Sequence, residues 1–197
     1  VMALALLLLS PATAEAEWQY KPFLGVIFGG ETTLIDLEAA AGHTHVAVGF
    51  GTLLIGEMLG VEADFGVAPG FFSAGEGAIL PEVEGSVVRS SVTTLTGNVV
   101  IAMPRRLMQY TLRPYFVGGG GLMHARSQEF FSSLLVTSTL PAMDIGGGVT
   151  GFLTNRLGVS WDVRYFRSIG NNEISGSSFG PEQLSFWRAN MALAIRY

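Results

Sequence analysis

The 197-residue sequence has no cysteine and a single lysine, Lys21. Without cysteine, these residues form no disulfide, carry no thiolate nucleophile and build no cysteine-based zinc site. Lysine and arginine together number 11 against 16 acidic residues, so no basic cluster of the kind that binds phosphate backbones is present. We therefore expect no nucleic-acid partner, and no motif in the chain predicts a cofactor.

Charge of either sign is also scarce. Charged residues make up 14% of the sequence and hydrophobic residues 49%, with a mean hydropathy of +0.42. Soluble domains carry about 25% charged residues. After the opening segment, however, the chain lacks the run of about 20 apolar residues that a membrane-spanning helix needs. Apolar character spread thinly in this way is typical of a transmembrane β-barrel.

The opening segment has the features of an export signal. Residues 3–9 read ALALLLL, and Ser10-Pro11 and a group of small residues follow. The apolar run is too short to span a bilayer, and cleavage after Ala14 or Ala16 fits the small-residue rule. We expect residues 1–16 to be a truncated signal peptide and residues 17–197 to be the barrel domain. A short buried helix is the alternative.

The remaining sequence alternates between apolar and polar residues with a period of two, which is the pattern of strands with two different faces. At the C-terminus, Trp187, Met191 and Leu193 share one face, and Arg188 and Arg196 share the other. Eight such segments are expected, at residues 20–29, 43–55, 60–68, 90–103, 112–125, 141–153, 157–167 and 186–197. The facing of the first and fifth segments is ambiguous.

Short and long connections alternate between these segments. The second, fourth and sixth segments are followed by short gaps, and the others by long ones, as in outer-membrane barrels with short periplasmic turns and long outer loops. The sequence therefore predicts an all-β fold, an eight-stranded antiparallel up-and-down transmembrane β-barrel. Both termini are then expected in the periplasm.

Charged residues fall on the less apolar face of the expected strands. A charge facing lipid at mid-depth costs about 2–4 kcal/mol, so this face is expected to point into the barrel. An eight-stranded barrel has room inside for side chains and little else, which predicts a plugged polar interior. The expected interior network comprises Glu62, Asp64, Asp144, Asp162, Arg164, Arg188 and Arg196. A path for protons or ions is the functional alternative.

Aromatic residues lie near strand ends on the apolar face, where a membrane-interface belt would place them. Tyr165, Trp187 and Tyr197 have this position, and Tyr115 is a further candidate. In the long connections, an apolar cluster predicts an interaction surface for an extracellular ligand, because exposed apolar patches mark binding sites. Its residues are Phe71, Phe72, Phe130 and Phe131. The alternative is that these connections extend the strands above the membrane and that their apolar residues pack on one another.

Two stretches resemble the OmpA-like and OmpX-like outer-membrane barrel superfamily. These are DIGGGVTGFLTNRLGVSWDVRYF at residues 144–166 and LRPYFVGGGGL at residues 112–122. The ending FWRANMALAIRY, with Leu193, Ile195 and Tyr197, resembles the signal read by the barrel assembly machinery, although Phe usually stands last. The resemblance implies a structural or adhesive role without catalysis. It also implies contact with outer-membrane lipid and lipopolysaccharide.

Two other classes of function were weighed: a narrow porin for small solutes and a lipid A-modifying hydrolase. Such hydrolases place a His and a Ser two residues apart, whereas His124 and Ser127 are three apart and would face opposite sides of a strand. His43 and His45 share a face, but no third metal ligand follows at a definite spacing. No catalytic, cofactor or metal residue is therefore predicted.

Overall fold

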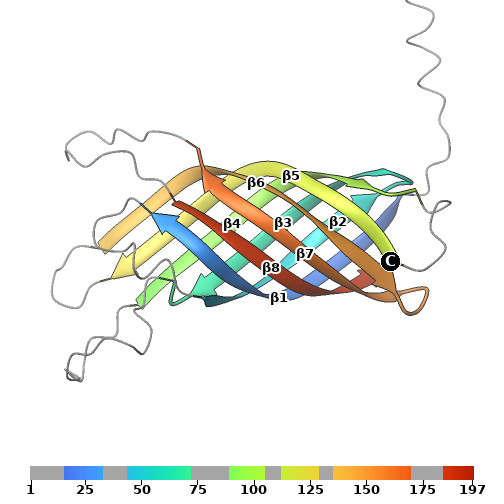
Figure 1. Cartoon of the computed structure of the whole chain (residues 1–197), viewed down its shortest axis with the longest axis horizontal. Coiled ribbons are helices and arrows are strands. Elements are labelled where there is room, and N and C mark those ends of the chain that lie inside the picture. Colours follow the sequence, from blue (N-terminus) through green and yellow to red (C-terminus); the bar gives the residue numbers. More distant parts are fainter. Residues whose placement is uncertain (1–15, 33–43, 72–88, 105–111, 129–134, 170–183) are drawn as a thin grey trace, which may run out of the picture.

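The computed structural model describes residues 16–32, 44–71, 89–104, 112–128, 135–169 and 184–197. These residues form a closed barrel in which each strand pairs antiparallel with its neighbours in sequence and β1 pairs with β8 (Figure 1). The strands are β1 (Glu17–Thr32), β2 (His45–Ile55), β3 (Leu59–Pro69), β4 (Arg89–Ala102), β5 (Leu112–Gln128), β6 (Leu135–Phe152), β7 (Leu157–Ser168) and β8 (Leu184–Arg196). The predicted all-β eight-stranded barrel is confirmed. The expected signal peptide lies almost entirely outside the described residues.

The strands run from 11 to 18 residues, which suffices for tilted strands that cross a bilayer. The longest two, β5 and β6, are paired from Leu112↔Gly151 to Gln128↔Leu135. Both strands extend beyond the expected boundaries, which were residue 125 for the end of β5 and residue 141 for the start of β6. The pairing of β6 with β7 stops at Ala142↔Ser168, whereas β5 and β6 continue to pair with each other beyond that point.

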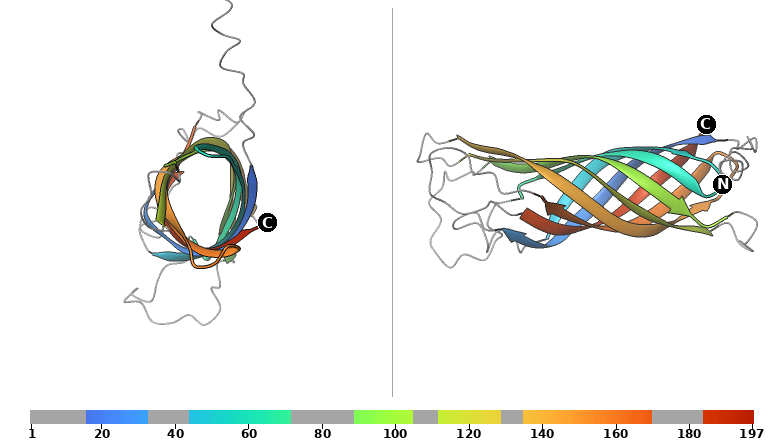
Figure 2. Two further views of the ribbon diagram at one scale, coloured as in Figure 1. Left: turned by 90° about the vertical axis from the view of Figure 1, so that its right-hand side faces the viewer. Right: turned by 90° about the horizontal axis from the view of Figure 1, so that it is seen from above.

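Figure 2 shows the barrel along its axis and from the side, and the strand bounds give its two ends connections of different length. One end, here called the short-turn end, carries the connections at residues 56–58, 103–111 and 153–156. The start of β1 and the end of β8 also lie there, and Tyr197 N donates to Trp18 O (3.0 Å). The opposite end, here called the long-connection end, carries residues 33–44, 70–88, 129–134 and 169–183.

The outer wall of the barrel is apolar. Large side chains such as Leu24 (56% exposed) and Ile145 (66%) alternate with buried neighbours along each strand. In the described part of the wall, outward-facing charged side chains occur only near the long-connection end, at Glu31, Arg126 and Arg167. The middle of the wall therefore offers the surface that hydrocarbon requires. The described residues include no helix that is long and apolar enough to cross a membrane.

The facing of β8 gives a direct test of this wall. Leu193 points outward, whereas its neighbour Ala192 is 5% exposed and faces inward. If the wall faces a bilayer, arginine at position 193 would meet hydrocarbon at a cost of about 2–4 kcal/mol. We expect Leu193→Arg to lose the heat-modifiable gel mobility that marks a folded barrel, and Ala192→Ser to keep it. Equal folded fractions of the two variants would contradict the assigned faces.

Candidate functional site in the barrel interior

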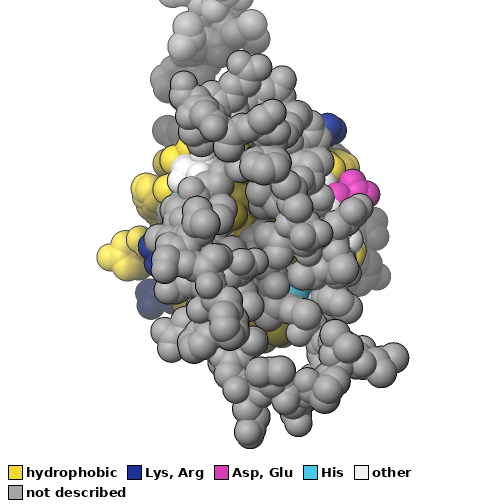
Figure 3. Space-filling view, turned by 90° about the vertical axis from the view of Figure 1, so that its left-hand side faces the viewer, with side chains coloured by type: hydrophobic (Ala, Val, Ile, Leu, Met, Phe, Trp, Pro, Cys, Tyr) yellow, Lys and Arg dark blue, Asp and Glu magenta, His cyan; other side chains and the backbone are white. Residues whose placement is uncertain are grey.

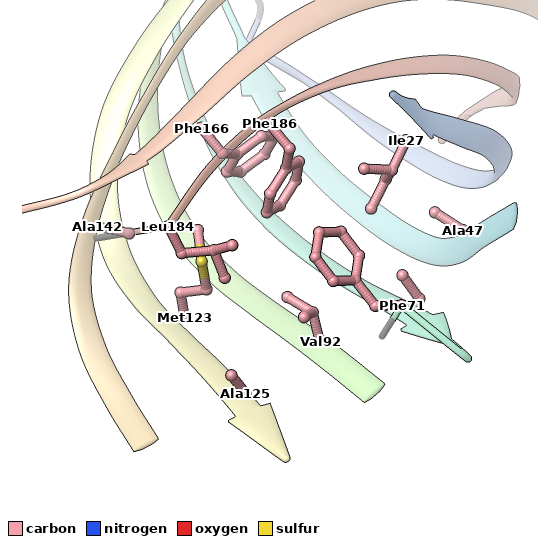
Figure 4. Packing of buried hydrophobic residues seen from close by; sticks show 11 residues of the cluster. Ile27, Ala47, Phe71, Val92, Met123, Ala125, Ala142, Phe166, Leu184 and Phe186 are labelled. Carbon is pink, nitrogen blue, oxygen red and sulfur yellow. The ribbon is translucent and has the colours of Figure 1, made fainter. Parts of the chain in front are cut away.

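The long-connection end is closed by an apolar layer, here called the upper seal (Figure 4). All eight strands contribute a buried side chain to it, and its large members Phe71, Met123, Phe166, Leu184 and Phe186 are fully buried. Its members are Ile27, Ala47, Ala68, Phe71, Val92, Met123, Ala125, Ala142, Phe166, Leu184 and Phe186. Phe166 on β7 and Phe186 on β8 are cross-strand partners within it, and their rings stack with centroids 5.2 Å apart.

Phe71 belongs to this seal, so its predicted place in an exposed loop surface is wrong. The side chain is fully buried, and its ring lies 5.6 Å from that of Phe186 and 5.2 Å from that of His45. The preceding Gly70 has a φ of 73°, a left-handed conformation that side chains disfavour. This turn directs Phe71 over the mouth of the barrel. Phe72, Phe130 and Phe131 lie outside the described residues.

Beneath the upper seal lies a layer of charged side chains, here called the charged belt. It contains four carboxylates, from Glu62 and Asp64 on β3, Asp144 on β6 and Asp162 on β7. Three cations face them, from Lys21 on β1, Arg164 on β7 and Arg188 on β8. All seven are buried, and unpaired ions in such a setting would be very costly.

Arg164 is the hub of the charged belt. Its Nη1 lies 2.6 Å from Glu62 Oε1, 3.8 Å from Asp64 Oδ2 and 3.9 Å from Asp144 Oδ2. Its Nε donates to Asp162 Oδ1 at 3.0 Å. One guanidinium therefore lies within ion-pair distance of all four carboxylates, which its fork of donors makes possible.

Arg188 is the direct cross-strand neighbour of Arg164 on the inner face of β7 and β8. Like charges placed opposite one another destabilise a strand pair. Here the compensating charge comes from across the lumen, because Arg188 Nη2 donates to Asp64 Oδ1 (2.6 Å) and Arg164 Nη1 to Glu62 Oε1 (2.6 Å). Arg188 also lies between the rings of Phe23 and Phe166, at 4.7 and 4.6 Å. The belt thus ties β3 to β7 and β8.

Lys21 of the charged belt, and Tyr115, which contacts the belt, come from strands whose facing was ambiguous in sequence. Lys21 Nζ lies 3.6 Å from Glu62 Oε2 and 4.8 Å from the centre of the Tyr115 ring. Tyr115 points inward and donates its hydroxyl to Asp162 Oδ2 (2.9 Å), so its expected place in an aromatic belt is wrong. The inward position of Lys21 could have been suspected from sequence, because it is the single lysine of the chain.

Neutral polar groups complete the belt. Asn190 Nδ2 donates to Asp162 Oδ1 (2.9 Å), and the hydroxyls of Thr150 and Ser160 are 2.9 Å apart. The Asn98 amide is best oriented with its nitrogen toward Asp144 Oδ1 (2.8 Å), because its oxygen then accepts from Arg164 Nη1 (3.2 Å). Asp144 is the carboxylate farthest from a cation, and in this orientation the Asn98 amide donates a hydrogen bond to it.

A second set of inward side chains lies at the short-turn end, here called the lower seal. On the side of β2, β4 and β5 it is an apolar cluster of Leu53, Ile55, Val100, Ala102, Tyr115 and Val117. Below the cluster, Arg113 donates to the carbonyls of Met103 (3.1 Å), Gly56 (3.2 Å) and Glu57 (2.6 Å). The guanidinium thus joins the connection at residues 56–58 to the end of β4.

Arg196 lies on the other side of the lower seal and does not reach the charged belt, where the sequence reading placed it. It is eight residues beyond Arg188 on β8. Its Nε is 2.9 Å from Glu17 Oε2, and its guanidinium lies 3.8 Å from the centre of the Phe152 ring. The other six predicted interior residues are in the belt. Arg196 instead links the first and last strands where the barrel closes.

The remaining sequence candidates are not brought together into a reactive site. His124 faces outward on β5, and its Nδ1 lies 2.8 Å from Thr139 Oγ1. His45 packs against Phe71, while His43 and the side chain of Ser127 lie outside what the structure describes. No three His, Asp or Glu side chains within the described ranges are placed to hold a metal ion. Leu193 and Ile195 face outward on β8, and Tyr197 follows its end.

Comparison with solved structures identifies the fold. No family model and no curated protein matches the sequence. The N-terminal β-barrel domain of Pseudomonas aeruginosa OprF is similar, with a TM-score of 0.56, 12% identity, and coverage of 93% of this chain and 99% of that domain. Neisserial surface protein A is similar with a TM-score of 0.58 and 9% identity, over 91% of this chain and 97% of that one. OprG of P. aeruginosa is similar with a TM-score of 0.53 and 12% identity, over 93% of this chain and 97% of that one.

At such low identity these likenesses concern the fold alone. The chain has the fold of the OmpA-like and OmpX-like outer-membrane β-barrels, as the resemblance in its sequence predicted. The chain also spans nearly the whole of each matched structure, so the shared unit is the barrel itself. These three structural neighbours are outer-membrane β-barrel proteins.

Proposed function

We propose that this chain is an integral outer-membrane protein whose interior is closed to solutes and whose work is structural or adhesive. The observation that carries the proposal is the layering of the interior. A charged belt centred on Arg164 lies between the upper seal at one end and the lower seal at the other. A pore requires a continuous polar path, and the upper seal interrupts such a path with side chains from every strand.

The apolar outer wall supports residence in a bilayer, and the unequal ends support an orientation. In outer-membrane barrels the short turns face the periplasm and the long connections face the exterior. Applied to this chain, that rule places both termini in the periplasm and residues 33–44, 72–88, 129–134 and 170–183 outside. Because the charged belt and the two seals fill the interior, we assign interaction with other molecules to the outer end.

An epitope tag tests location and orientation together. A tag inserted within residues 72–88 should be bound by antibody on intact bacterial cells. A matched tag between Asn155 and Arg156, in the exposed turn between β6 and β7, should be bound only after permeabilisation. In the same cells, antibody on the first tag should lower attachment to polystyrene if the role is adhesive. Labelling of the second tag on intact cells would overturn the proposed orientation.

Porin and enzyme roles find less support in the described residues. A narrow pore would need the upper seal to part, and a hydrolase would need an accessible nucleophile beside a base. His124, the histidine of the sequence candidate, lies beside a threonine hydroxyl on the outer wall. We therefore propose a non-enzymatic role at the cell surface.

A further inference from the structure

The outer wall of β4, β5 and β6 carries a sharp boundary between apolar and polar residues near the long-connection end. Paired positions on the three strands form rows across the wall. One row is Leu95, Leu122 and Pro141; the next is Thr93, His124 and Thr139; and Ser91 pairs with Arg126 beyond it. All these residues face outward, because they alternate with buried Val92, Thr94, Met123, Ala125 and Leu140. The apolar wall therefore ends at one row, and hydroxyls and positive charge begin at the next.

The polar side of this boundary is suited to an anion. Arg126 is exposed, and on these three strands no described outward position carries a carboxylate. His124 Nδ1 lies 2.8 Å from Thr139 Oγ1, and in the tautomer in which the threonine hydroxyl donates to Nδ1, Nε2 carries the proton and can donate to a ligand. Guanidinium groups bind phosphate oxygens through two parallel hydrogen bonds, and hydroxyls add further donors.

We propose that this phosphate-binding patch, formed by Ser91, Thr93, His124, Arg126 and Thr139, binds the phosphate of an anionic lipid headgroup. The inference rests on the proposed residence in a bilayer and adds a lipid class and a site to it. Headgroup phosphates lie at the level where the apolar surface of a membrane protein ends. Cationic side chains at that level attract anionic lipids.

The apolar row explains why a lipid fits better than a free anion. Leu95 is 52% exposed and Leu122 is 51% exposed, directly beside the polar row. A phosphate bound at Arg126 would place its acyl chains along these leucines, and the buried apolar area adds to the affinity. A single exposed arginine offers a free phosphate ion little in water. Figure 3, which looks onto the long-connection end, shows hydrophobic side chains along one flank of the barrel.

Native mass spectrometry tests the site. The full chain would be released from nanodiscs that contain equal amounts of phosphatidic acid and phosphatidylcholine, and the lipids retained would be counted. We expect the wild type to retain phosphatidic acid preferentially. Arg126→Gln should weaken this preference about fivefold, the effect of one basic side chain near a charged surface. Arg156→Gln, an exposed arginine in a turn at the opposite end, should retain it.

The outcomes separate this site from general charge attraction. An equal loss in Arg126→Gln and Arg156→Gln, or retention of the preference by both, would overturn the assignment. Displacement of phosphatidic acid by millimolar inorganic phosphate would show that the anion alone is recognised, which would overturn the lipid part. Failure of the wild type to enter nanodiscs would instead contradict the proposed membrane residence.

Discussion

Arg164→Met is expected to prevent stable closure of the barrel. The substitution leaves four buried carboxylates facing only Lys21 and Arg188, and removal of one partner from a buried ion pair costs about 3–5 kcal/mol. The cost is expected at the upper end of this range, since Glu62 and Asp162 both lose close contacts of 2.6 and 3.0 Å. Urea titration of the heat-modifiable folded band in detergent micelles measures it.

Two further variants make this test specific. Arg167→Met removes an arginine from the same strand, but that side chain faces outward near the end of β7 and should leave the folded band unchanged. Adding Glu62→Gln to Arg164→Met removes the carboxylate with the shortest contact and should restore part of the lost stability. A double-mutant cycle measures the coupling. A folded Arg164→Met with wild-type stability would show that the belt does not hold the barrel together.

Gly121→Val is expected to block the pairing of β4 with β5. Gly121 faces inward, and a Cβ there would meet Leu95 O and lie 2.7 Å from Thr96 Cα, both on the adjacent backbone. Backbone cannot swing away as a side chain can, so the strands would have to part. We expect Gly121→Val to remain in the unfolded band during refolding into lipid vesicles.

Gly97→Val is the matched control, because Gly97 belongs to β4 and faces outward. A Cβ at position 97 would have nothing within 4 Å, and valine favours extended strands. The variant should therefore fold at least as well as the wild type. If Gly97→Val and Gly121→Val fold equally well, the described approach of β4 to β5 is wrong.

Much of the barrel could be predicted from sequence because its two surfaces meet different surroundings. Along β8, Leu193 faces outward while Arg188 faces the belt, and this contrast gives the alternation that predicts strand and facing together. The same contrast placed Glu62 and Asp64 on the inner face. Outward positions are apolar because they face hydrocarbon, and inward positions can be polar because they pair with other side chains. The sequence therefore alternates with a period of two.

This contrast between an apolar outer face and a polar inner face is lost where apolar side chains also point into the barrel. On β1, inward Phe23 and Ile27 alternate with outward Leu24 and Val26, so both faces are apolar and facing cannot be read. Lys21 was therefore not assigned to the belt, although it is the only lysine of the chain. The place of Phe71 depends on the left-handed turn at Gly70, and a phenylalanine in a connection gives no signal of which way that turn points.

The cross-lumen contacts also lay beyond sequence reasoning. The ion pair of Arg164 with Glu62 joins residues 102 positions apart, and that of Arg188 with Asp64 joins residues 124 apart. Alternation places each side chain inside but gives no depth along the axis. Depth depends on the stagger between strands, and only the closed register supplies it. For the same reason Arg196 was grouped with a belt that it does not reach.

Single-channel recording in planar lipid bilayers tests the central claim most directly. The folded chain should give no conductance steps across the voltages at which the bilayer itself is stable. The belt is sealed by Phe71, Phe166 and Phe186 at one end and by the cluster around Leu53 and Val100 at the other. A steady open level from barrels that show the heat-modifiable folded band would contradict a closed interior, and the proposed surface role would then give way to a pore.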